Sequence, residues 1–198
     1  MTTLRLAVST DAAAIADIYG PFCESTPISF EVMAPTAQEI ARRIDRITAQ
    51  YPWLVLDDGG IVAGYAYASQ HRERLAYQWS VDVAVYVRSE YRRLGVARAL
   101  YAALLDLLRL QGYFKAYGGI TLPNPASVAL HESVGFKPIA VYRGVGYKLG
   151  TWHDVAWYGA ELQPEQSAPD RPHPIGEFVE SPSWREALTR GMQRDKGR

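Results

Sequence analysis

The sequence contains one cysteine, no excess of charge of either sign and no long hydrophobic run. Cys23 has no partner for an intramolecular disulfide, and no group of Cys and His residues has the spacing of a zinc site. The 21 basic and 21 acidic residues balance, so no bulk attraction to nucleic acid or an acidic membrane is expected. The amino terminus lacks the layout of a signal peptide, and no segment approaches membrane-spanning length. The sequence therefore predicts a soluble cytoplasmic protein without a metal, a nucleic-acid partner or a membrane partner.

The most regular stretch of the chain runs from residue 80 to residue 110. Valines alternate with other residues from Val81 to Val87, which predicts a strand. A basic turn follows, and then a helix from Ala97 to Leu110 with its leucines on one face. A strand that enters a helix through a small-residue turn leaves several backbone N–H groups unpaired and pointing one way. This arrangement favours phosphate binding.

The 198 residues, 48% of them hydrophobic, are enough for one large domain with its own core. Residues 24–33 are predicted to be a loop that either walls a substrate site or is a packed connector. Gly64 lies inside a predicted strand and indicates close packing or a bulge. The elements expected before residue 80 are a strand (4–8), a helix ended by Gly20-Pro21, a helix after the capping box Thr36–Glu39, and a hairpin (53–57 and 61–68).

After the central stretch we expect a strand at 120–122, a helix that Asn124 caps, and two closing strands at 136–141 and 155–162 with a shaped loop between them. Beyond residue 162 the composition becomes polar and rich in proline. We therefore expect one folded domain over 1–162 and a proline-rich, polar extension over 163–198 with a short helix at 183–193. The extension is expected to fray rather than to dock on a neighbour.

The turn reads Arg92-x-x-Gly95-x-Ala97, which matches neither the Walker nor the dinucleotide fingerprint. It resembles the pyrophosphate loop of the GNAT superfamily of N-acetyltransferases. Further collinear segments resemble the phosphinothricin N-acetyltransferase group of that superfamily, which includes enzymes that act on methionine sulfoximine and methionine sulfone. These segments are Ile28-Ser29-Phe30-Glu31, Gly64-Tyr65-Ala66, Trp79-Ser80-Val81-Asp82 with Val85-Tyr86-Val87, Leu122-Pro123-Asn124 with Ser127, His131-Glu132 with Gly135-Phe136, and Gly146-Tyr147-Lys148 with Trp152-His153-Asp154.

The resemblance implies an α/β (α+β) GNAT fold, with a mixed, twisted central sheet splayed at the cofactor site and flanked by helices. It implies acetyl-CoA as the co-substrate, without a metal. The pantetheine arm is expected to pair with the backbone of the central strand, and the pyrophosphate to lie on backbone amides of the turn. Asn124 and Ser133 are further candidates for contact with the coenzyme. The expected cofactor-binding residues are therefore Val85, Tyr86, Val87, Arg92, Arg93, Leu94, Gly95, Val96, Ala97, Arg98, Asn124 and Ser133.

Asp82 occupies the position at which the family has a glutamate as general base, although its side chain is one methylene shorter. The alternative is a strand carboxylate paired with a cation such as Arg74. His131 is the second candidate for proton transfer, or a structural hydrogen-bonding residue. Phe136 lies where many relatives have a tyrosine that protonates the leaving thiolate, so that acid is absent here.

The resemblance assigns Arg72, Glu73 and Arg74, together with Asp82, to the acceptor substrate. Arginines bind anionic groups bidentately, although a charged, solvated connector is the alternative. The resulting prediction is a homodimeric acetyltransferase that acts on a small amino acid of the phosphinothricin, methionine sulfoximine or methionine sulfone type. The alternatives are a protein or peptide N-terminal acetyltransferase on the same fold, and a non-catalytic acyl-CoA-binding module.

Overall fold

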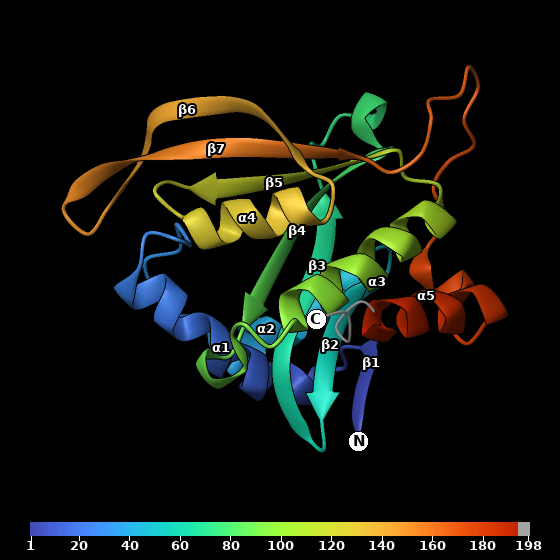
Figure 1. Ribbon diagram of the computed structural model, residues 1–198, viewed down its shortest axis with the longest axis horizontal. Coiled ribbons are helices and arrows are strands. Elements are labelled where there is room, and N and C mark those ends of the chain that lie inside the picture. Colours follow the sequence, from blue (N-terminus) through green and yellow to red (C-terminus); the bar gives the residue numbers. More distant parts are fainter. Residues whose placement is uncertain (194–198) are drawn as a thin grey trace.

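The computed structural model describes residues 1–193 and forms a seven-stranded mixed sheet flanked by helices (Figure 1). The strand order is β1-β2-β3-β4-β5-β7-β6. This confirms the predicted α/β architecture. The strands are β1 Thr2–Leu6, β2 Trp53–Asp58, β3 Ile61–Gln70, β4 Ser80–Val87, β5 Lys115–Thr121, β6 Lys137–Lys148 and β7 Thr151–Glu161. The helices are α1 Ala12–Ser25, α2 Ala37–Thr48, α3 Val96–Gln111, α4 Pro125–Ser133 and α5 Pro182–Gln193.

The sheet opens between β4 and β5, as predicted. β4 pairs with β3 along its whole length, but its parallel pairing with β5 ends at Asp82, opposite Tyr117. Beyond this point β5 turns away from β4, while it pairs with β7 along its whole length (Figure 1). The backbone from Val83 to Val87 therefore has a strand partner on one side only within the described chain. Its other edge is free to hydrogen bond to a ligand.

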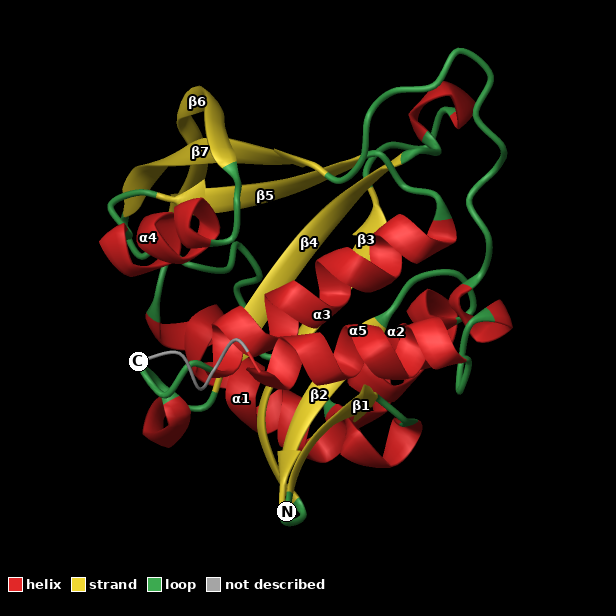
Figure 2. Ribbon diagram, turned by 45° about the vertical axis from the view of Figure 1, so that its right-hand side comes forward, coloured by secondary structure: helices red, strands yellow, loops and turns green. Residues whose placement is uncertain are grey.

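Helices cover the two faces of the β1–β4 half of the sheet (Figure 2). On one face lies α3, whose Leu100, Leu104, Leu107 and Leu108 are fully buried in the larger core. Burial of each such side chain contributes about 1.5–3 kcal/mol. On the other face lie α1 and α2, which form a second core with Trp53 and Tyr65 of the sheet. None of the helices that residues 1–193 form is long and apolar enough to cross a membrane.

The first helix does not end at Gly20-Pro21, so that prediction was wrong. α1 continues to Ser25 with Pro21 inside it. A proline in a helix interior removes one backbone hydrogen bond and costs about 3 kcal/mol. The next turn offsets part of this cost, because it buries Cys23 completely and brings the Phe22 ring within 5.1 Å of the Tyr86 ring. Packing against the sheet therefore outweighs the Gly20-Pro21 signal for a helix end.

The carboxyl-terminal strands are longer than predicted. β5 begins at Lys115, so Gly118 lies inside the strand instead of before it. The expected loop between the two closing strands is instead the continuation of the β6–β7 hairpin. Its tight turn is Leu149-Gly150, and both residues have positive φ angles, 51° and 80°. Such primed turns match the natural twist of two antiparallel strands.

The extension does not fray within the described residues. α5 lies along α3 on the outer face of the molecule (Figure 2), with Trp184 6% exposed and Ala187 fully buried. Ile175 is 1% exposed and donates its backbone N–H to the carbonyl of Gln50. A few apolar residues separated by polar ones thus anchor a segment whose composition resembles a linker.

Candidate active site

The turn before α3 presents uncapped backbone amides. Arg93 and Gly95 both have positive φ angles, 63° and 82°. Gly95 is the N-cap of α3, and no side chain accepts a hydrogen bond there. The first bond of the helix is donated by Ala99 to the Gly95 carbonyl, at 3.0 Å. The preceding amides of the first turn have no intrahelical acceptor, so the site suits an anion such as a pyrophosphate.

Gly64 of β3 brings this turn close to the sheet. A Cβ atom on Gly64 would lie 2.9 Å from the Tyr86 carbonyl oxygen and 3.0 Å from Cγ1 of Val96. The register of β2 and β3 also shifts beside it, between Leu56 and Asp57. Both interpretations of this glycine, close packing and a bulge, are therefore confirmed. The close approach places the start of α3 beside the end of β4.

Three arginines surround the turn. Arg92, Arg93 and Arg98 are all exposed. The Arg92 guanidinium also lies 5.4 Å from the centre of the Phe22 ring, at the carboxyl-terminal end of α1. The structure therefore brings together the turn, its cations and the free edge of β4. The Tyr86 side chain packs against Tyr19 and Phe22, so only its backbone remains for a ligand.

Asp82 contacts a histidine, and not Arg74. Its Oδ1 lies 2.7 Å from Nδ1 of His71, which follows the end of β3. The alternative in which Arg74 neutralises Asp82 is therefore not the one formed. Burial raises the pKa of Asp82, and the hydrogen bond to His71 opposes part of the shift. His71 was not singled out from the sequence. One signal in the sequence could have found it. His71 follows one strand of a hairpin and Asp82 lies near the start of the next, where the family has a glutamate that is one methylene longer.

An open pocket of about 670 Å³ is lined by His71 of this pair. The predicted substrate residues Arg72, Glu73 and Arg74 line it together with His71. Its lining is completed by Gln70 and Tyr77. The Arg72 guanidinium lies 5.9 Å from the Trp157 ring centre, and the His71 ring stacks on Tyr117 with 4.6 Å between centroids. The structure thus gathers two cations, an anion and an imidazole in one pocket.

His131 lies elsewhere. Its side chain is 4% exposed. Nε2 hydrogen bonds with the Tyr101 hydroxyl at 3.1 Å, and Nδ1 lies 2.8 Å from the Ser127 carbonyl oxygen. Burial lowers its pKa. Its ring lies against Gly118, whereas the ring of His71 lies against the neighbouring Tyr117. Because successive strand residues point to opposite faces, the two histidines flank opposite faces of β5. The structure therefore does not bring His131 to Asp82, and its contacts suit a structural residue.

The two remaining coenzyme candidates lie on α4. Asn124 is its N-cap and accepts a hydrogen bond from the Ser127 N–H at 3.1 Å, as predicted for the helix start. Ser133 is exposed at the other end of the helix, and its hydroxyl donates to the Leu130 carbonyl. Asn124 follows the end of β5, across the splay from β4. The Ser133 hydroxyl instead hydrogen bonds within α4, at the carboxyl-terminal end of that helix.

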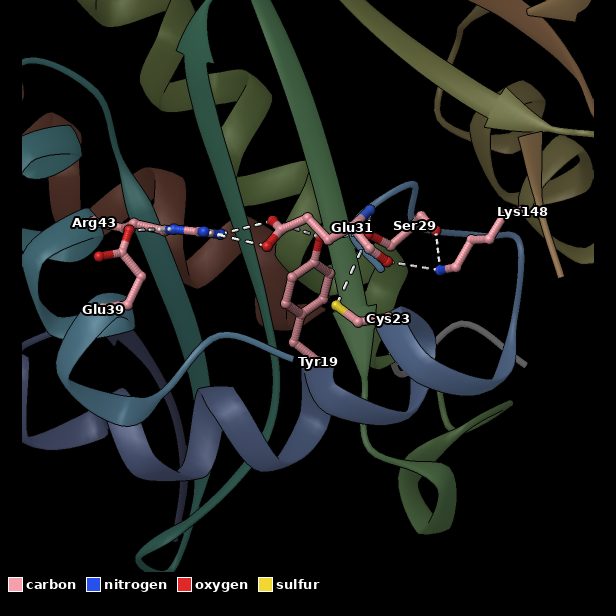
Figure 3. A network of polar contacts seen from close by, with 7 residues as sticks. All are labelled: Tyr19, Cys23, Ser29, Glu31, Glu39, Arg43 and Lys148. Carbon is pink, nitrogen blue, oxygen red and sulfur yellow. Dashed lines mark hydrogen bonds and ion pairs between the residues drawn. The ribbon is translucent and has the colours of Figure 1, made fainter. Parts of the chain in front are cut away.

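The loop between α1 and α2 is held by a polar network (Figure 3). Lys148, 5% exposed at the end of β6, donates to the backbone carbonyls of Ser29 at 2.5 Å and Glu31 at 2.8 Å. Glu31 in turn accepts from Arg43 of α2 at 2.7 Å and from the Tyr19 hydroxyl at 3.1 Å. The loop is therefore tied by hydrogen bonds and an ion pair to the hairpin and to α2, although its Phe30 and Val32 side chains stay exposed. Nothing in the sequence pattern singled out Lys148 for this role.

Partly buried Tyr67 of β3 relates this network to Asp82. Burial raises its pKa, and the charges of Arg43, Glu31 and Asp82 all act on it. Tyr67 also stacks on Trp53 at 4.5 Å. The anchored loop and the Asp82 carboxylate thus lie on the same face of the sheet, with Tyr67 between them. Both interpretations of the loop, a substrate wall and a packed connector, are compatible with this placement.

Comparison with known proteins identifies the family. The model of the acetyltransferase (GNAT) domain matches residues 4–157. The chain is 39% identical over 169 residues to the phosphinothricin N-acetyltransferase of Streptomyces viridochromogenes, covering 85% of this chain and 91% of that protein. It is 33% identical to the L-methionine sulfoximine/L-methionine sulfone acetyltransferase of Salmonella typhimurium, covering 85% and 98% of the two chains.

A solved structure shows the same fold. The GNAT superfamily phosphinothricin acetyltransferase from Sinorhizobium meliloti, crystallised in complex with acetyl-CoA, is similar with a TM-score of 0.78 and 32% identity. The match covers 84% of this chain and 95% of that chain. Since the family model and these relatives span most of the sequence, the chain belongs to the GNAT acetyltransferase family and is an N-acetyltransferase.

Proposed function

We propose that the chain transfers the acetyl group of acetyl-CoA to the amino group of a small amino acid of the phosphinothricin, methionine sulfoximine or methionine sulfone type. One observation carries this proposal: the free edge of β4 runs from the uncapped start of α3 to Asp82, whose partner His71 lines a pocket together with Arg72 and Arg74. The names of the relatives support the same substrate class.

The residues at the splay fit acetyl-CoA. The helix start at Gly95 has no side chain over its first amides, which leaves room for a pyrophosphate. Residues 93–98 would hold that group, with charge from Arg92, Arg93 or Arg98. The backbone of Val85, Tyr86 and Val87 would pair with the pantetheine arm, with Asn124 across the splay. When bound, the coenzyme supplies an acetyl thioester, an activated acyl group.

The protein's own contribution to the chemistry is to position the amine and remove its proton. An ammonium group has no lone pair for attack, so a base must act before or during acyl transfer. The Asp82 carboxylate and its partner His71 supply this function in the proposal. A backbone N–H of β4 would stabilise the developing oxyanion. Phe136 is 2% exposed and has no acidic proton, so the side chain at this position does not act as the general acid.

Arg72 and Arg74 would bind the anionic groups of the acceptor. Both are exposed and line the pocket, and a guanidinium binds a carboxylate or phosphinate through two parallel hydrogen bonds. The Arg72 guanidinium lies over the Trp157 ring, and Tyr77 lines the same pocket. An amino acid with a second anionic or strongly polar head group therefore suits the pocket.

We also propose that the protein is a homodimer. The β6–β7 hairpin forms one edge of the sheet and exposes a row of large apolar side chains, which in a soluble protein marks an interaction surface. These side chains are 40% to 66% exposed: Ile139, Val141, Tyr142, Val145, Tyr147, Leu149 and Trp152. Light scattering at micromolar concentration should give the dimer mass. Val145→Asp should lower that mass to the monomer value, whereas Ile61→Asp, at a similarly exposed position elsewhere, should leave it unchanged.

The division into a catalytic domain over 1–162 and an extension over 163–198 remains a proposal, and so does a cytoplasmic location. The family model ends at residue 157, which supports a domain boundary near residue 162. Cys23 is buried and has no disulfide partner in the sequence, which suits a reducing compartment and supports the cytoplasmic location. Residues 194–198 lie outside the described part of the chain.

The experiment that tests the proposed function is thiol release from acetyl-CoA with a panel of amines. The panel contains phosphinothricin, methionine sulfoximine, methionine sulfone, ordinary amino acids and short peptides. Turnover is expected on at least one amino acid with a sulfone, sulfoximine or phosphinate group. Turnover on peptides alone would contradict the proposal and favour peptide N-terminal acetylation.

A further inference from the structure

The two nitrogens of His71 have different surroundings. Nδ1 lies 2.7 Å from Oδ1 of Asp82, while no hydrogen bond joins Nε2 to any described residue. His71 lines the open pocket, whereas Asp82 is not among the residues that line it. An imidazole whose Nδ1–H donates to a carboxylate keeps its lone pair on Nε2. Both side chains reach the surface, with 14% of His71 and 30% of Asp82 exposed, but only His71 lines this pocket, and its basic atom would be Nε2.

The ring is held in this orientation from two further sides. It stacks on Tyr117 with 4.6 Å between centroids and an interplanar angle of 29°. The Tyr77 ring meets it edge-on at 5.9 Å. The His71 side chain is only 14% exposed, although it borders an open pocket. A group fixed by stacking and by a carboxylate loses little entropy when it transfers a proton, which suits catalysis.

We propose that Nε2 of His71 accepts the proton of the acceptor's ammonium group, and that Asp82 positions the imidazole and stabilises its charged form. This inference rests on the proposed acetyl transfer and assigns the base within it. The N–H bond of the ammonium breaks, its electron pair stays on the amine nitrogen for attack, and the proton forms a bond to Nε2. The imidazolium then returns the proton to water through the open pocket.

The charges around His71 are consistent with this role. The Asp82 carboxylate contacts the ring directly, with Oδ1 2.7 Å from Nδ1. The Arg72 guanidinium donates to the His71 backbone carbonyl at 2.9 Å and lies over the Trp157 ring. The other titratable or charged neighbours are Glu73, Arg74, Tyr77 and Tyr117. An aspartate, one methylene shorter than a glutamate, also leaves room beside its carboxylate for the His71 ring.

Two substitutions separate the roles of the pair. His71→Gln should lower kcat by about 10²–10⁴-fold, the usual contribution of a general base, with the KM for acetyl-CoA within about threefold of the wild type. Asp82→Asn should lower kcat by no more than His71→Gln does, because the base itself remains although the amide no longer fixes its tautomer. His173→Gln, an exposed histidine on the extension, is the matched control and should not change kcat. A larger loss for Asp82→Asn than for His71→Gln would overturn the assignment.

The pH profile and chemical rescue distinguish a base from a structural residue. The deficit of His71→Gln should shrink about tenfold per pH unit up to the pKa of the substrate amine, because the unprotonated amine needs no base. Added imidazole should restore part of the activity of His71→Ala. A deficit that is constant with pH and insensitive to imidazole would overturn the proposal and leave His71 a packing residue.

A spectroscopic test does not depend on turnover. Nitrogen NMR of the imidazole, assigned by comparison with His71→Gln, should show that the neutral form of the His71 ring has its proton on Nδ1. A proton on Nε2 would overturn the proposal, because that nitrogen would then have no lone pair. Wild-type enzyme that acetylates no amine would contradict the proposed function itself. Active wild type with an equally active His71→Gln would contradict only the present inference.

Discussion

Gly191 of α5 lies directly against the backbone of Ala99 in α3. A Cβ atom on Gly191 would lie 2.8 Å from the Ala99 carbonyl oxygen and 2.9 Å from the Ala103 Cβ atom. The extension is thus packed without spare room against the first turns of the helix whose amides form the proposed phosphate site.

Gly191→Ala should therefore lower the free energy of unfolding by about 1–3 kcal/mol, the usual cost of overpacking. Because the strain falls on the first turns of α3, the affinity for acetyl-CoA should also fall. Urea unfolding and calorimetric titration measure the two effects. Gly176→Ala is the matched control, since a Cβ atom there would meet nothing within 4 Å. Equal stability of the two variants would contradict the observed docking of α5.

Two adjacent glycines of β5 provide a second test. A Cβ atom on Gly118 would lie 2.8 Å from Nε2 of His131, whereas one on Gly119 would approach no atom closer than 3.5 Å. Gly118→Ala should therefore destabilise the fold by about 1–3 kcal/mol, and Gly119→Ala should be nearly neutral. Thermal unfolding of the pair measures the difference. If both variants unfold at the wild-type temperature, the buried position of His131 is wrong.

Much of the central stretch could be predicted because its signals are local. The period of two in β4, the capping residues Thr36 and Asn124, and the glycine turn before α3 each depend on neighbours within a few residues. Thr36 accepts from the Glu39 N–H at 3.2 Å, as the capping box predicts. The structure agrees with these predictions because local geometry and tertiary packing favour the same conformation.

The remaining features depend on contacts between distant residues. Pro21 is tolerated inside α1 only because the turn after it packs on Tyr86 of β4. In the sequence Lys148 looks like an ordinary strand residue. Its role depends on its contact with the Ser29 carbonyl, which is far away in the chain. The His71–Asp82 contact depends on the register of β3 and β4, in which Gln70 pairs with Val81. No single segment contains this information.

Lys148 gives a third prediction. Its ammonium group satisfies buried carbonyls of the α1–α2 loop, and hydrogen bonds to charged groups contribute roughly 1.5–3 kcal/mol each. Lys148→Met should lower the unfolding free energy by about 2–3 kcal/mol and raise the KM for the amine, because the loop at Glu31 loses its anchor. The control is Lys137→Met, at an exposed position of the same strand. A stable variant with an unchanged KM would show that the anchor is dispensable.

His131 makes stability depend on pH. Burial lowers its pKa in the folded protein, so the unfolded chain binds more protons once the pH falls below about 6.5, the usual pKa of histidine. The unfolding free energy should therefore decrease from pH 7 to pH 5, by at most about 1.4 kcal/mol per pH unit from this group.

Urea unfolding at several pH values should show a weaker slope for His131→Asn than for the wild type. An unchanged slope in His131→Asn would mean that His131 is not held neutral by burial.

The most direct test of the account is turnover of acetyl-CoA with methionine sulfone, measured by thiol release and by the mass of the acetylated product. The wild type should form the N-acetyl product, and Arg72→Gln with Arg74→Gln should raise the KM for the amino acid at least tenfold. The affinity for acetyl-CoA should not change, because the turn at Gly95 is intact in this variant. No product from this or any other amino acid, together with acetylation of peptides, would contradict the account.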